Sequence, residues 1–246
     1  MNPVPKRLTK EPLIEAIWQV QFEGEQGIGD VLPGILFTGL RNEHPKLQLQ
    51  RLPSANIPAP IAERDPQLRF APKMLMEKPD GPFVWQVGDR VITLNCRKPY
   101  VGWEKFKVAV LALMQIVESS GLVPNPQRHS LRYINLLRDE LAVDLAALRL
   151  ALKLGDYQIK DRVQMRLEIP DAECLHVVQI ATAAQVNLAG KQMTGSIIDL
   201  ETLPVNTPGN WDTLRGQLDL LHDHLKELLF RQILTEETIQ KLEPEY

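Results

Sequence analysis

Apolar and polar residues alternate along several stretches of the chain. This alternation predicts strands, because successive side chains of a strand point to opposite faces of a sheet. Residues 12–22 show the pattern, with Ala16, Trp18 and Val20 on one face. Residues 163–169 alternate in the same way and are expected to form a half-buried strand. Further strands are expected at 47–52, 67–76, 83–95, 128–138, 174–188 and 193–200.

In other stretches apolar residues recur three and four positions apart, which is the spacing of one face of an amphipathic helix. Helices are expected at 28–42, 103–117, 144–154 and 212–231. The last of them carries a stripe of leucines, which predicts packing against the core and, as the alternative, a subunit interface. Residues 53–66 contain four prolines and are expected to form a loop without regular structure in its middle.

These elements follow one another in the order βαβββα, and the same order occurs twice. Strands linked by short turns favour antiparallel pairing. The pattern therefore predicts an α+β protein of two similar βαβββα halves, with a mainly antiparallel sheet and the helices packed on one face. The halves are expected at residues 1–126 and 127–246, with one continuous domain as the alternative. The internal duplication rests on element order, since the halves share no convincing residue-level identity.

Composition narrows the class of protein. The chain has 246 residues, of which 44% are hydrophobic and 24% charged, so wholesale disorder is not expected. The longest apolar run, Val108–Met114, is too short to span a membrane, and no apolar segment follows the basic residues near the start. The two cysteines are too few for a disulfide framework. A soluble, cytoplasmic protein without a membrane partner is expected.

The charge balance bears on nucleic-acid binding. The formal net charge is −3, whereas proteins that bind nucleic acid mainly through its phosphates usually carry a basic surplus. RNA is therefore a disfavoured partner. An RNA-binding or RNA-processing module stays an alternative, with the exposed face of a sheet presenting Tyr157, Lys160, Arg162 and Arg166 to a single strand.

The sequence shows no recognisable catalytic motif. No phosphate-binding glycine loop and no G-x-S-x-G nucleophile turn occurs. His222 and His224 are two residues apart on an expected helix, so they point in different directions and cannot share one metal ion. No catalytic residue, metal or cofactor is expected. A hydrolase or small-molecule enzyme whose residues converge only in three dimensions stays an alternative.

Two segments are richer in polar and aromatic residues than structure requires, and they are the candidate binding residues. Tyr100 and Trp103 stand at the entrance to the second expected helix. Tyr133 and Asn135 share one face of an expected strand, and Arg132 points to the other face. The alternative is structural: the aromatic residues attach the helix to the sheet, and Asn135 satisfies a buried backbone group.

Four segments, in this order, resemble a family of uncharacterised proteins that is distributed sporadically among bacteria and archaea. They are the opening 11–17 (EPLIEAI), the helix entry 99–106 (PYxxWxxF), the strand 131–135 (LRYIN) and the tail 230–235 (FxxxLT). The resemblance spans nearly the whole chain. It implies no known activity, cofactor or catalytic residue. Sporadic occurrence is typical of horizontally transferred genes, including defence loci, which is an association and not a mechanism.

Together these observations favour a non-catalytic binding or assembly protein, with a protein partner or self-association into a homo-oligomer, in a mobile or defence-type locus. An RNA-binding or RNA-processing module and an enzyme stay the alternatives. The leucine stripe is the feature that suggests a subunit interface.

Overall fold

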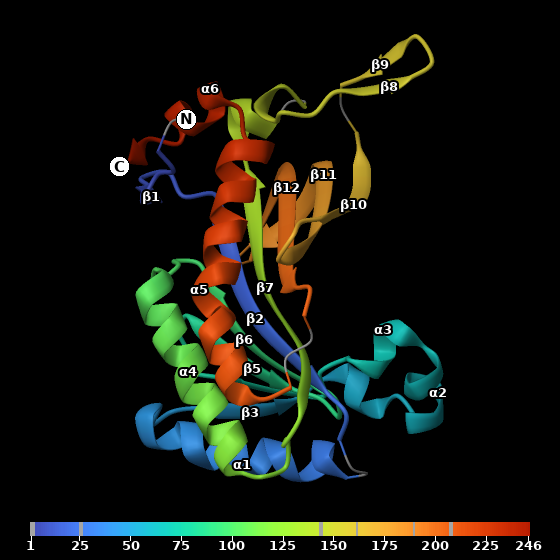
Figure 1. Ribbon diagram of the computed structural model, residues 1–246, viewed down its shortest axis with the longest axis vertical. Coiled ribbons are helices and arrows are strands. Elements are labelled where there is room, and N and C mark those ends of the chain that lie inside the picture. The colour runs from blue at the N-terminus through green and yellow to red at the C-terminus, as the bar shows by residue number, and fades with distance from the viewer. Residues whose placement is uncertain (1–2, 25–26, 143–144, 161, 189, 207–208) are drawn as a thin grey trace. The chain divides into compact units, whose positions relative to one another are not determined.

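The computed structural model describes residues 3–24, 27–142, 145–160, 162–188, 190–206 and 209–246 (Figure 1). Contacts within the chain group it into two compact units, each built from segments that are distant in sequence. The first unit comprises Met1–Ile14, Arg132–Thr202 and Leu221–Tyr246, and the second comprises Glu15–Leu131 and Leu203–Leu220. The division into continuous halves at residue 126 stays a prediction.

The second unit contains an antiparallel meander and two amphipathic helices. Strands β2, β6, β5, β4 and β3 pair antiparallel in that order. Their bounds are Leu13–Phe22 for β2, Gln48–Arg51 for β3, Met74–Glu77 for β4, Phe83–Val87 for β5 and Val91–Arg97 for β6. Helices α1 (Ile28–Glu43) and α4 (Trp103–Ser119) contact each other and the strands. The alternate residues of β2 are buried, as the sequence predicts.

The first unit contains the strands β10, β11, β12 and the end of β7, in that order. Their bounds are Pro126–Leu137 for β7, Gln164–Pro170 for β10, Cys174–Leu188 for β11 and Lys191–Pro204 for β12. Helix α5 (Trp211–Glu227) ends in this unit, continues as the π-helical segment η4 (Leu228–Ile233) and is followed by α6 (Glu236–Lys241).

Two small antiparallel pairs complete the first unit. Strand β1 (Arg7–Leu8) pairs with β13 (Pro244–Glu245), so the segments near the two termini lie side by side. Strands β8 (Leu152–Leu154) and β9 (Tyr157–Ile159) form a hairpin that stands away from β10, β11 and β12 in Figure 1.

The α+β class is confirmed, with antiparallel pairing and helices on one side of the sheet. The element order differs from βαβββα in both halves. The expected strand 83–95 is two strands, β5 and β6. The expected helix 144–154 is wrong: its described residues form no α-helix and contain the 3₁₀ turn η3 (Leu145–Ala147) and strand β8, and Asp144 lies outside them. Internal duplication is not confirmed.

The proline-rich stretch is also more regular than expected. It contains the 3₁₀ turn η1 (Pro53–Asn56), helix α2 (Ala59–Arg64) and helix α3 (Pro66–Arg69), of which α3 replaces the start of the expected strand 67–76. The prolines stand in or next to the first turn of each segment. A proline is tolerated there because its missing N–H would have no helical partner.

The leucine stripe of α5 belongs to the core. Leu214, Leu218, Leu221 and Leu225 have no exposed surface. Core packing is therefore the correct interpretation of the stripe, and a subunit interface must use another surface. None of the helices in the described part of the chain is both long enough and apolar enough to span a bilayer.

Candidate functional site

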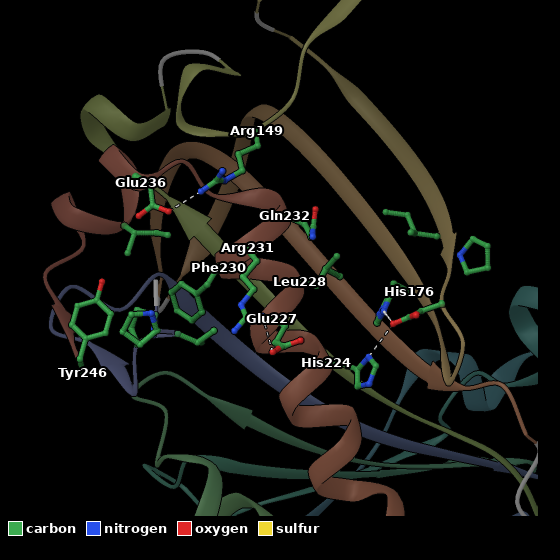
Figure 2. A pocket seen from close by; sticks show the side chains of 17 residues that line it. Arg149, His176, His224, Glu227, Leu228, Phe230, Arg231, Gln232, Glu236 and Tyr246 are labelled. Carbon is green, nitrogen blue, oxygen red and sulfur yellow. Dashed lines mark hydrogen bonds and ion pairs between the residues drawn. The ribbon is translucent and has the colours of Figure 1, made fainter. Parts of the chain in front are cut away.

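The first unit contains a cavity of about 620 Å³. Residues ahead of β1, the end of β10, strand β11 and the segment from α5 to α6 line it. Figure 2 shows His176 and His224 on one side of the α5–η4 segment, with Glu236 and Tyr246 on the other. π-helical segments such as η4 are rare in proteins, and those that occur are frequently at functional sites.

Three potential metal ligands converge at one end of this cavity. Asp171 follows β10, His176 belongs to β11 and His224 belongs to α5. Asp171 Oδ2 lies 3.4 Å from His224 Nδ1 and 3.9 Å from His176 Nε2. One ligand atom from each residue lies within 4.8 Å of the others, and the two imidazole rings stack with centroids 5.8 Å apart.

A hydrogen bond on its other nitrogen fixes the His176 ring. His176 Nδ1 lies 2.8 Å from Thr202 Oγ1, and both residues are buried. This bond directs Nε2 toward Asp171. Burial, together with the nearby His224, lowers the pKa of His176 below its ordinary value. His176 is therefore held as a neutral imidazole at neutral pH.

The other end of the cavity carries opposite charges beside apolar side chains. Arg149 Nε donates to the carbonyl of Leu234 at 2.7 Å, and its guanidinium also donates to Glu236 at 2.9 Å. Arg231 pairs with Glu227 at 3.2 Å on α5 and η4. Because these charges are paired within the chain, this end of the cavity has no strong electrostatic potential of one sign.

Three of the five predicted binding residues lie in the first unit, on two faces of β7. Arg132 Nε donates to Asp199 Oδ1 at 2.7 Å, and a second guanidinium N–H donates to Asp199 Oδ2. Tyr133 is buried, and its hydroxyl lies 2.7 Å from His222 Nδ1. Asn135 is also buried, and its amide is within 3.5 Å of backbone carbonyls of Tyr133 and Ile198. These contacts are structural ones, and binding by the three residues stays a prediction.

Tyr100 and Trp103 lie in the second unit, at the start of α4. Trp103 Nε1 donates to Asp219 at 3.0 Å. Both rings contact Phe106, with centroid distances of 6.1 Å for Tyr100 and 6.3 Å for Trp103. The contacts agree with attachment of the helix to its neighbours, and binding by these two residues stays a prediction.

The cysteines have the surroundings of structural residues. Cys96 and Cys174 are both buried. Burial, together with the charges of Asp171 and Glu173, raises the pKa of the Cys174 thiol to about 11. The Cys174 thiol therefore stays protonated at neutral pH and is a poor nucleophile.

Strand β10 is the most exposed of the long strands. It lies at the end of the strand order and pairs with β11 on one side. Leu167 is 39% exposed and Ile169 37%, whereas a half-buried strand was expected from the alternation. The strand itself is confirmed and Met165 is partly buried, whereas Leu167 and Ile169 stay accessible at the sheet edge. Arg166 and Glu168 form an ion pair of 2.7 Å on the other face.

Sequence reasoning found the polar strand 131–135 but missed the Asp171–His176–His224 cluster. His176 and His224 are separated by 48 residues, so no local spacing signals that they meet. Their meeting depends on the packing of α5 against β11, which local patterning does not specify. Comparison with models of known protein families and with curated proteins finds no match to this chain, so its resemblance to the sporadic prokaryotic family stays a prediction.

Proposed function

We propose that the chain is a non-catalytic assembly protein that associates with a second copy of itself along the outer edge of β10. The observation that carries this proposal is the residue order at that edge: Met165, Arg166, Leu167, Glu168 and Ile169. The order is self-complementary about Leu167, with apolar residues at matching positions and opposite charges on either side. A strand edge of this kind can serve as a template for another strand.

The backbone of β10 has hydrogen-bonding groups directed outward. Asp171 N donates to Cys174 O at 2.8 Å, and Thr182 N donates to Val163 O at 2.9 Å. Hydrogen-bonded pairs recur at every second residue of an antiparallel pair, so the odd-numbered residues of β10 bond to β11. The groups that point to the outer edge belong to Gln164, Arg166 and Glu168.

These outward groups allow one register in which charge and hydrogen bonding agree. In an antiparallel pair of β10 strands centred on Leu167, Arg166 of one copy lies opposite Glu168 of the other. Both residues present outward backbone groups, so they can exchange two N–H···O bonds. The symmetry of the pair repeats this arrangement on the other side of Leu167, as in an isologous interface.

The neighbouring registers are disfavoured. A pair centred on Arg166 would place two arginines opposite each other, and one centred on Glu168 would place two glutamates opposite each other. Like charges directly opposite across strands are destabilising. The charges therefore select the register centred on Leu167, which also brings Met165 opposite Ile169 on the apolar face.

Exposed apolar side chains of the first unit add to the proposed contact surface. Leu154 is 74% exposed and Tyr157 69%, and both belong to the β8–β9 hairpin. Large exposed apolar residues favour protein association over a solvated surface, and this hairpin belongs to the same unit as β10. Pairing would also cover Leu167 and Ile169.

Charge reversal tests the register. Arg166→Glu places glutamate opposite Glu168 at two symmetric positions, and each position is expected to lose about 1 kcal/mol, so dimerisation weakens about 30-fold. Glu168→Arg is expected to have a similar effect. The double variant Arg166→Glu/Glu168→Arg restores opposite charges and is expected to recover dimerisation. Light scattering after size-exclusion chromatography over a range of concentrations measures the dissociation constant.

Lys191→Glu makes the same change in charge at the start of the interior strand β12, and is expected to leave dimerisation unchanged. Absorbance recorded at two wavelengths detects bound nucleic acid in the same experiment. A wild-type chain that stays monomeric at all concentrations would refute self-association. Equal dimerisation of both single variants and the wild type would refute the register.

A further inference from the structure

We infer that Asp171, His176 and His224 bind one divalent cation of the zinc type at the end of the cavity in the first unit. The site does not require the proposed self-association, although Ile169 of β10 lines the same cavity. Two imidazole nitrogens and one carboxylate oxygen are a donor set that zinc prefers. None of these residues was assigned a binding role by the sequence.

The separations of the three ligand atoms suit a metal better than direct hydrogen bonds. A zinc ion with ligands at 2.0–2.1 Å and tetrahedral angles holds its ligand atoms about 3.3 Å apart. Asp171 Oδ2 and His224 Nδ1 already lie 3.4 Å apart. His176 Nε2 lies 3.9 Å from the same oxygen, beyond hydrogen-bond distance. All three ligand atoms lie within 4.8 Å of one another, so side-chain adjustments of Asp171 and the two histidines would be needed to reach tetrahedral spacing.

The hydrogen bond of its Nδ1 with Thr202 Oγ1 gives His176 the orientation that a metal ligand needs. Histidine ligands in proteins almost always use their second ring nitrogen to bond a neighbouring group, which fixes both the ring and the tautomer. With a proton on Nδ1 directed to Thr202 Oγ1, the lone pair of Nε2 points to Asp171. A carboxylate oxygen and a nitrogen lone pair repel each other unless a cation lies between them.

Three protein ligands leave one position of a tetrahedral zinc ion open. Asp171, His176 and His224 all line the cavity, so this position faces its interior. Figure 2 shows His176 and His224 close together at that end of the cavity, and a nitrogen of each faces Asp171 Oδ2. A water molecule or an oxygen atom of a bound ligand can occupy the fourth position, as in zinc sites that exchange ligands.

Glu173 provides an internal comparison. Its carboxylate lies 3.7 Å from His224 Nε2, on the opposite nitrogen from the one that faces Asp171. One imidazole cannot direct both nitrogens to the same ion. Glu173 is therefore an acidic neighbour outside the coordination sphere. Its substitution tests whether zinc affinity depends on the three ligands or only on nearby negative charge.

The site is tested by titrating zinc into the chelator-treated full chain and measuring the heat of binding by calorimetry. The wild type is expected to bind one ion. Asp171→Asn and His224→Gln, at exposed and half-buried positions, are expected to weaken binding at least ~100-fold, since loss of a neighbour that only orients a ligand already costs 10–100-fold. Thr202→Val is expected to weaken it ~10-fold by releasing His176. Glu173→Gln and His44→Ala are matched controls and are expected to bind as the wild type does.

Cobalt substitution gives a second readout, because tetrahedral cobalt has a visible absorption that His224→Gln should abolish. Circular dichroism and thermal unfolding show that each variant is folded. Absence of zinc binding in the wild type, or equal affinity of wild type, Asp171→Asn and His224→Gln, would overturn the assignment. Equal affinity for magnesium or calcium would overturn the zinc type. If Glu173→Gln lost zinc binding while Asp171→Asn and His224→Gln kept it, the ion would be attracted by negative charge and not coordinated by the three residues. That result would also overturn the assignment.

Discussion

Lowering the pH from 7 to 4.5 is expected to reduce the free energy of unfolding of the second unit by about 2.5 kcal/mol through His129 alone. His129 is buried, and Trp18 Nε1 donates to its Nδ1 at 3.4 Å. Its Nε2 lies 2.9 Å from Gln217 Oε1. These two bonds satisfy the neutral ring, so a second proton has no partner.

The direction of this effect follows from the two pKa values. Burial lowers the pKa of His129 from 6.5 to about 4, and the Gln217 bond only partly opposes it. Between these values the unfolded chain binds a proton that the folded chain does not. The stabilisation is therefore complete above pH 6.5 and is lost as the pH falls toward 4.

Urea unfolding at pH 7 and pH 4.5, followed by tryptophan fluorescence, measures this loss. The four tryptophans, at positions 18, 85, 103 and 211, all belong to the second unit, so the signal reports on that unit. His129→Gln is expected to remove most of the loss. His44→Gln, at a less buried histidine, is expected to change it less. An unchanged pH dependence in His129→Gln would contradict the assignment.

Arg132→Ala is expected to lower the free energy of unfolding of the first unit by about 2 kcal/mol. The Asp199 side chain is only 11% exposed, and both of its oxygens accept hydrogen bonds from Arg132. Removing the arginine leaves a nearly buried carboxylate without its main donor. The loss is below the 3–5 kcal/mol of a fully buried pair because Arg132 is itself 36% exposed.

Urea unfolding followed by circular dichroism, with hydrogen exchange of β11 and β12 peptides, measures this change in the first unit. Arg132→Met/Asp199→Leu removes both charges and is expected to be less destabilised than Arg132→Ala, since no unpaired charge remains. Lys153→Ala, at an exposed residue of β8, is the control and is expected to change stability by less than about 0.5 kcal/mol. Weaker self-association of a fully stable Arg132→Ala would instead favour the binding role predicted for Arg132.

The period of the apolar residues predicted the elements that bury one face and expose the other. Strand β2 and helices α1 and α4 each bury one face, so the period of their apolar residues specified them within about two residues. The α+β class followed from the same periods. The helix expected at 144–154 failed because its apolar residues serve a 3₁₀ turn and a hairpin strand, and spacing alone does not separate these cases.

The sequence by itself determined the elements with a clear apolar period, such as β2, α1 and α4, and the α+β class with antiparallel pairing. Only the tertiary structure decided that β10 is an edge strand, because an edge strand and an interior strand alternate in the same way and differ in their neighbours. It also decided that Asp171, His176 and His224 meet, since three segments distant in sequence must pack together before their ligand atoms converge. Local periodicity reports which face of an element is apolar, whereas a site depends on which elements face each other.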